Sequence, residues 1–165
     1  MKEHQTVKFQ IPIYLKAFLV DQYGGEPLWI NQKDKLHDLL QFLLKKPPTG
    51  WVPRYPEPDP GNDYITIQLP FYKNMNPLVY CYLSNPAIHT FITWVKKKFW
   101  ITYEQHMDKA FLHGITVIDA VRLFIDKHDL PDDHQVEEML RKQIYRSRNL
   151  HRKIPKRKYH IHPKE

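Results

Sequence analysis

Six of the chain's 14 prolines fall between residues 47 and 60, and no other feature constrains the fold as strongly. Proline fixes φ and lacks a backbone N–H, so neither a regular helix nor a central strand can run through such a segment. The composition predicts an extended loop over residues 46–62, which Trp51 and Tyr55 pack onto the body of the protein. A proline-rich ligand for a partner protein is the alternative interpretation of this loop.

Upstream of the loop, the sequence predicts one short strand and two helices. Residues 7–9 favour the strand. A proline near its start and a glycine just past its end mark a helix over residues 12–23. Asn31 is a favourable N-cap for a second helix over residues 32–45, whose leucines repeat at helical spacing and predict a buried face.

Downstream of the loop, two apolar and aromatic runs predict an antiparallel β-hairpin. Residues 63–69 alternate with the period of a strand, and residues 78–83 form the second run. We expect the aromatic rings of the hairpin to pack in the core, and the alternative is that they stack on single-stranded bases. These rings belong to Tyr64, Phe71, Tyr72, Tyr80 and Tyr82.

The rest of the chain has the apolar spacing of helices. Helices are predicted over residues 87–99 and 102–113, and a capping-box pattern introduces the second of them. Two more are predicted over residues 117–128 and 134–152, separated by an aspartate-rich turn at 129–133. The expected fold is therefore α+β and mostly helical, with N-terminal helices and a hairpin followed by a C-terminal helical bundle.

A chain of 165 residues fits one domain, or one compact domain with an appendage. The sequence divides into three regions. Residues 1–84 form an N-terminal α+β region that includes the proline-rich loop, and residues 85–153 form a C-terminal helical region. Residues 154–165 form a basic extended arm bounded by prolines. Arms of this kind order when they contact a groove or a phosphate backbone.

The formal net charge of +7 is confined to the C-terminal end of the chain. Residues 1–133 contain 15 Lys and Arg against 15 Asp and Glu, whereas residues 134–165 contain ten against three. Such an asymmetry indicates an anionic partner more strongly than a high isoelectric point alone. A solubilising tail is the alternative, but the tyrosines and branched aliphatic residues between the charges argue against it.

The last two predicted helices and the turn at 129–133 resemble the helix-turn-helix and homeodomain-like DNA-binding proteins of phages and mobile elements. The resemblance is architectural and covers residues 86–153. In those proteins the last helix lies in the major groove, which implies that the last helix and the arm contact nucleic acid here. The candidate contacts are Gln135, Lys142, Tyr145, Arg146, Arg148, Asn149, Arg152 and Lys153 on the helix, and Lys156, Arg157 and Lys158 in the arm.

The predicted function is that of a DNA-binding accessory or regulatory protein, such as a transcription regulator, that prefers duplex DNA to RNA. Two alternatives stay open: an RNA-binding component of a ribonucleoprotein, and a structural or adaptor protein of a phage-like assembly, whose arm would bind an acidic protein surface. A homodimer is allowed, because Trp29, Trp94 and Trp100 suit either a core or a subunit interface.

The sequence argues against an enzyme. Cys81 is the single cysteine, glycine-rich phosphate loops are lacking, and the aspartates at 129–133 have an explanation as helix caps. We expect no metal and no cofactor. The polar N-terminus and the lack of a long apolar run predict a cytoplasmic protein that does not span a membrane.

Overall fold

The computed structural model describes residues 5–151, with side chains through residue 148, so the predicted arm at 154–165 lies outside it. The fold is α+β and mostly helical. Its small sheet consists of β1 (Thr6–Pro12), β2 (Leu28–Trp29) and β3 (Asn62–Gln68), in the order β1-β3-β2. β1 pairs with β3 in antiparallel register, and β2 pairs with β3 in parallel register.

The partner of β3 corrects the predicted hairpin. β3 forms as expected, but it pairs with β1, so that Phe9 lies opposite Ile65. Residues 78–83 form no strand and make only a single bridge, between Tyr82 and Lys45. Alternation fixes which residues form a strand but not which strand lies beside it. Here β1 offers three residues that are buried on the same side as the buried residues of β3.

The two N-terminal helices are confirmed. α1 (Ile13–Tyr23) ends at Gly24, whose φ of 81° lies in the left-handed region that favours glycine. α2 (Lys35–Leu43) begins later than predicted, because Asp34 rather than Asn31 caps it. The Asp34 carboxylate accepts a hydrogen bond of 2.8 Å from the backbone N–H of Leu36.

The helices predicted at 87–99 and 102–113 are one continuous helix, α3 (Asn85–Leu112), of 28 residues. The predicted start at Thr102 is wrong, because the Thr102 hydroxyl donates to the carbonyl of Lys98, one turn earlier, at 2.9 Å. Threonine inside a helix often bonds in this way, and the capping-box sequence alone does not exclude it. The apolar stripe continues through this point, and Phe99 and Tyr103 are fully buried on either side of it.

The last two helices occur where the sequence predicts them. α4 (Val117–Lys127) is capped by Thr116, whose hydroxyl accepts a hydrogen bond from the backbone N–H of Asp119. α5 (His134–His151) begins after Asp133, whose carboxylate accepts a hydrogen bond from the backbone N–H of Gln135 at 3.1 Å. The aspartate-rich turn therefore caps α5, as predicted.

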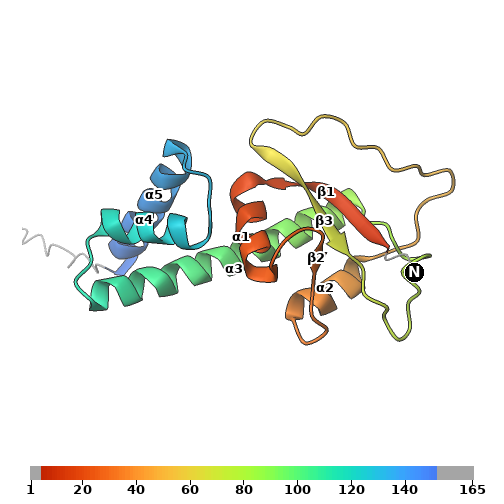
Figure 1. The fold of residues 1–165 in the computed structure, drawn as a ribbon, viewed down its shortest axis with the longest axis horizontal. Helices are drawn as coiled ribbons and strands as arrows, with labels where there is room; N and C mark the ends of the chain where they lie inside the picture. Colours follow the sequence, from red (N-terminus) through yellow and green to blue (C-terminus); the bar gives the residue numbers. More distant parts are fainter. Residues whose placement is uncertain (1–4, 152–165) are drawn as a thin grey trace, which may run out of the picture.

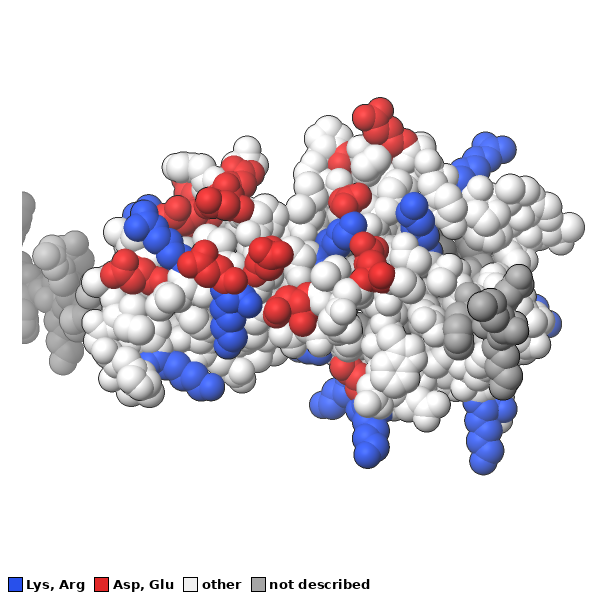
Figure 2. All heavy atoms as spheres, in the orientation of Figure 1, with Lys and Arg blue, Asp and Glu red and all other residues white. Residues whose placement is uncertain are grey.

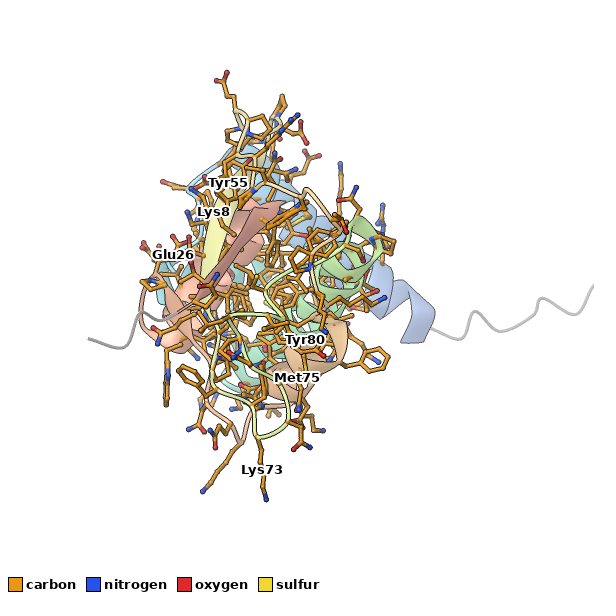
Figure 3. The ribbon with its side chains drawn as sticks, turned by 90° about the vertical axis from the view of Figure 1, so that its right-hand side faces the viewer. Lys8, Glu26, Tyr55, Lys73, Met75 and Tyr80 are labelled. Atoms are coloured by element: carbon orange, nitrogen blue, oxygen red, sulfur yellow. The ribbon has the colours of Figure 1, made fainter. Side chains whose placement is uncertain are left out.

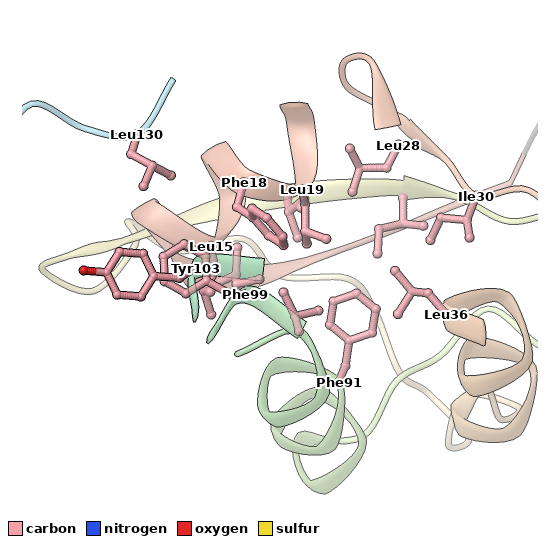
Figure 4. Packing of buried hydrophobic residues seen from close by; sticks show 14 of the residues in the cluster. Leu15, Phe18, Leu19, Leu28, Ile30, Leu36, Phe91, Phe99, Tyr103 and Leu130 are labelled. Atoms are coloured by element: carbon pink, nitrogen blue, oxygen red, sulfur yellow. The ribbon is translucent and has the colours of Figure 1, made fainter. Parts of the chain in front are cut away.

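α3 connects the two ends of an elongated molecule (Figure 1). The sheet, α1 and α2 surround its first half, whereas α4 and α5 lie beside its second half. The core is continuous between them (Figure 4). In the first half, the Phe91 ring meets the Phe9 ring edge to face with 5.1 Å between centroids, and in the second half the Tyr103 ring meets the Phe124 ring at 5.0 Å.

The proline-rich loop, defined here as residues 46–61, contains no helix or strand, as its composition predicts. Its two aromatic residues fasten it to the body of the protein, which confirms their expected role. Trp51 meets Tyr82 with 5.2 Å between ring centroids, and Tyr55 meets Tyr64 at 5.7 Å. The loop therefore follows a defined path over the sheet end of the molecule (Figure 1).

Candidate nucleic-acid interface

One face of α5 is buried, and this fixes which side chains the helix presents outward. Leu140 is fully buried and Ile144 nearly so. The Tyr103 hydroxyl of α3, also fully buried, donates a hydrogen bond of 2.8 Å to the carbonyl of Leu140. These contacts fix the rotation of the helix about its axis. Lys142, Tyr145 and Arg146 are therefore exposed.

The first half of α5 is close to electrically neutral. Lys142 Nζ lies 2.7 Å from a Glu138 carboxylate oxygen, and an Arg141 guanidinium nitrogen lies 3.9 Å from Glu137. The hydrogen bond from Lys142 and its charge lower the pKa of Glu138. Such pairs, one helical turn apart, are typical of a solvated helix surface. Lys142 and Arg141 therefore have carboxylate partners within the protein.

Acidic side chains surround the start of α5. Asp126, Asp129, Asp132 and Asp133 are all exposed on the end of α4 and on the turn that follows it. Figure 2 shows acidic side chains gathered over the α4 and α5 end of the molecule on the face in view. Negative charge of this density repels a polyanion. The start of α5, where Gln135 lies, is therefore a poor place for DNA to approach.

The second half of α5 has the opposite character. Tyr145 is 48 % exposed, and Arg146 and Arg148 are exposed as well. The Arg148 guanidinium lies 4.1 Å from the centroid of the Phe111 ring on α3, a cation–π contact that orients the side chain. Among the ion pairs of residues 5–148, none involves Arg146 or Arg148.

Three of the predicted contacts, Tyr145, Arg146 and Arg148, are thus exposed near the end of the described chain, although Arg146 and Arg148, two residues apart, lie on different sides of the helix. Gln135 lies about 15 to 20 Å from them along the helix, at ~1.5 Å per residue. Lys142 is paired with Glu138, and the remaining predicted contacts lie beyond the described side chains or residues: Asn149, Arg152, Lys153, Lys156, Arg157 and Lys158.

The five aromatic residues proposed as a stacking platform do not form one surface. Tyr72 is buried against His37, and Phe71 is 53 % exposed next to it in the chain. Tyr64 and Tyr82 each meet an aromatic residue of the proline-rich loop instead. Because the hairpin that would have aligned these rings does not form, its aromatic face does not exist.

A second cluster, of one lysine and two tyrosine rings, lies at the sheet end and was not predicted from the sequence. Lys8 Nζ lies 5.0 Å from the ring centroids of both Tyr55 and Tyr64. The three residues come from β1, the proline-rich loop and β3, so no local pattern connects them. Beside them lies a groove of about 730 Å³ between β1 and the loop.

Within the described residues, no group of three or more His, Cys, Asp or Glu side chains is arranged to hold a metal ion. None of the helices in residues 5–151 combines the length and the apolar character that crossing a bilayer requires. Comparisons with protein-family models, with curated proteins and with solved structures found no match.

Proposed function

We propose that this protein binds nucleic acid, with duplex DNA as the first ligand to test, through the second half of α5 and the basic residues that follow it. The observation that supports this proposal is a change of charge along one helix. In the first half, Arg141 and Lys142 are paired with glutamates, whereas Arg146 and Arg148 are exposed and form no ion pair within the described part of the chain. Six more Lys and Arg follow in residues 152–165.

This arrangement favours phosphate contacts over base readout at the start of the helix. Helix-turn-helix proteins commonly place the first turns of their last helix against the bases. Here those turns carry Glu137 and Glu138 and lie beside the acidic turn. The proposal therefore assigns phosphate binding to Arg146 and Arg148, with Tyr145 as the neighbouring ring that reaches a sugar or base. An accessory or regulatory role in DNA transactions is the function class that we propose.

The test is a fluorescence anisotropy titration of the full chain against a labelled duplex at several salt concentrations. We expect micromolar or tighter binding at low salt and a steep fall in affinity as salt rises. The double variant Arg146→Ala and Arg148→Ala is expected to reduce the slope of log K against log salt by about two, since each lost phosphate contact removes ~0.9. Deleting residues 152–165 is expected to reduce it further.

Lys33→Ala with Lys35→Ala is the matched control, because both lysines are exposed at the other end of the molecule, before and at the start of α2. It should leave the affinity and the salt slope unchanged. Absence of duplex binding at low salt contradicts the proposal. Stronger competition by single-stranded RNA would move the ligand to RNA, and a protein pull-down that survives nuclease treatment would favour the adaptor alternative.

A further inference from the structure

β1 is an edge strand, and its outer edge carries unpaired backbone groups. The antiparallel ladder to β3 uses alternate residues of β1. The backbone N–H of Leu69 donates to the carbonyl of Gln5, which sets the phase of the ladder. Val7, Phe9 and Ile11 therefore bond to β3. The N–H and C=O groups of the residues between them, including Lys8, point away from the sheet.

The proline-rich loop runs alongside this edge but does not pair with it. It is held at a distance by side chains. The backbone N–H of Asp59 donates to Gln10 Oε1 at 3.1 Å, and the Tyr64 hydroxyl donates to the carbonyl of Pro56 at 2.8 Å. Residues 5–151 show no backbone–backbone hydrogen bond between the loop and β1. The prolines of the loop explain this, because they have no N–H to donate to a strand.

A groove remains between the loop and the strand. We call it the β1 groove. It has a volume of about 730 Å³ and is lined by residues 5–10, by residues 50–56 and 59 of the loop, by residues 62 and 64 of β3, and by residues 81–83, 85 and 88. Leu83 and Ile88 give it an apolar wall, and its charged residues are Lys8, Arg54 and Asp59, which leaves a net positive charge. Figure 3 shows Lys8 and Tyr55 together beside β1.

We propose that the β1 groove binds an extended peptide of a partner protein, which adds to the sheet as a further strand along the outer edge of β1. Alternate side chains of the peptide then meet the apolar wall, and carboxylates on the peptide meet Lys8 and Arg54. This inference is independent of the proposed nucleic-acid binding, which lies on α5.

The spacing of the edge groups selects a peptide as the ligand. The outward groups of Thr6, Lys8 and Gln10 repeat every second residue, about 7 Å apart, which is the repeat of a β-strand. Strand addition to an exposed edge uses this match, with side-chain pockets for specificity. Pro12 has no N–H, so it ends the usable edge.

Other occupants fit less well. Single-stranded nucleic acid stacks its bases on free ring faces, but Lys8 Nζ already lies over the rings of Tyr55 and Tyr64, and the Trp51–Tyr82 pair is arranged edge to face rather than as a flat platform. A second copy of the chain would have to bring its own β1 edge into the groove, and that edge carries the same proline-rich loop. A single peptide strand has neither obstacle.

Nuclear magnetic resonance on the ¹⁵N-labelled full chain tests the proposal. The probe is a capped peptide of the same length as β1 that alternates valine with glutamate. We expect it to shift the amide signals of Thr6, Lys8 and Gln10 and to slow their hydrogen exchange. The Phe9 amide, which already bonds to β3, should keep its exchange rate. A version with lysine in place of glutamate should bind several-fold more weakly, because Lys8 and Arg54 repel it.

Two further experiments distinguish strand addition from nonspecific binding. A peptide that is N-methylated at alternate residues, so that one edge has no donors, should bind at least tenfold more weakly. Lys8→Pro removes an outward donor of β1 but none of the bonds to β3, and it should weaken binding about tenfold relative to Lys8→Ala, which removes the same charge but keeps the N–H. If the proline variant does not fold, Arg54→Glu serves instead, and it should weaken binding of the glutamate peptide and strengthen binding of the lysine peptide.

The proposal is overturned if neither peptide shifts these three amides at millimolar concentration, or if the N-methylated peptide binds as well as its parent. It is also overturned if oligouridine shifts them and the peptides do not. If neither peptide binds, the loop serves only to shield the edge of β1 from aggregation. None of these outcomes affects duplex binding, which is measured with variants of α5.

Discussion

The Tyr103 side chain is fully buried, and its hydroxyl links α3 to α5 through a hydrogen bond. It donates to the carbonyl of Leu140 at 2.8 Å, and burial raises the pKa of the phenol. Tyr103→Phe keeps the ring and removes the hydrogen bond. We expect the free energy of unfolding to fall by about 1 kcal/mol, the usual net value of such a bond. Urea denaturation measures it.

Tyr145→Phe is the matched control for that substitution, because Tyr145 is exposed on the same helix. It should change the free energy of unfolding by less than about 0.5 kcal/mol, as is usual for surface substitutions. Equal effects of the two substitutions would show that the bond between α3 and α5 does not contribute to stability.

Asp34 makes the stability of the sheet end depend on pH. Burial raises its pKa, but hydrogen bonds from the Leu36 N–H and the Tyr23 hydroxyl, together with the charge of Lys98, outweigh burial and lower the pKa overall. The folded state thus favours the ionised carboxyl. This contribution is complete above the unfolded-state pKa of ~3.9 and is lost as the pH falls through the lower folded-state pKa.

Asp34→Asn keeps an N-cap side chain but removes the charge. We expect it to lower the free energy of unfolding by about 1 kcal/mol at pH 7, because the neutral amide accepts weaker hydrogen bonds than the carboxylate, and by much less near pH 2. Urea titrations at the two pH values give the comparison. Asp108→Asn, at an exposed position of α3, should show little change at either pH. A pH-independent effect at Asp34 would contradict the charge argument.

At the level of elements, the sequence predicts helices better than it predicts partners or continuity. α1, α4 and α5 follow from apolar spacing and from residues at their ends, which are local signals. The pairing of β3 with β1 is not local, because more than fifty residues separate Phe9 from Ile65. The prediction of a helix start at Thr102 is wrong for a related reason. A capping box describes how a helix can begin, but the burial of Phe99 and Tyr103 keeps this helix continuous.

The continuity of α3 is tested at Glu104, an exposed position. Proline is tolerated in the first turn of a helix but not in its interior. Glu104→Pro is therefore expected to lower the free energy of unfolding by about 3 kcal/mol or more. Glu104→Ala should leave it nearly unchanged. If the proline variant is as stable as the alanine variant in urea denaturation, a helix begins near Thr102 after all.

The candidate interface could be predicted in part. The exposed face of α5 follows from the spacing of its apolar residues, and the pairing of Glu138 with Lys142 follows from their separation of one turn. The sequence shows the acidic turn as a helix cap, but its position beside the start of α5 would give it a second effect, on the proposed DNA binding. The β1 groove could not be predicted, since β1, the loop and residues 81–88 meet only in the folded chain.

For the whole molecule, charge is distributed unevenly between the two ends of α5. If the proposed DNA binding is right, the acidic turn weakens it at long range. Asp129→Asn with Asp132→Asn should tighten duplex binding several-fold at low salt, and the gain should shrink as salt screens the charges. Asparagine suits the left-handed φ of 47° at residue 129. Anisotropy titrations at two salt concentrations give the measurement.

Glu57→Gln with Asp59→Asn removes the same charge from the proline-rich loop and serves as the control. Both residues are exposed in the proline-rich loop at the sheet end, whereas α5 lies at the other end of α3, so their charges should affect duplex binding less. An equal gain from both double variants would mean that net charge, rather than its location, governs the affinity.

α3 also determines how far apart two ligands of this protein would be held. Its 28 residues span about 42 Å, and its only proline is in the first turn, so nothing in its sequence introduces a kink. β1 lies near one end of this helix and α5 near the other (Figure 1). A partner held at β1 and a duplex held at α5 would therefore stand at a fixed separation and a fixed angle. The length of the helix would then determine how far from the duplex the partner is held, and on which side of it.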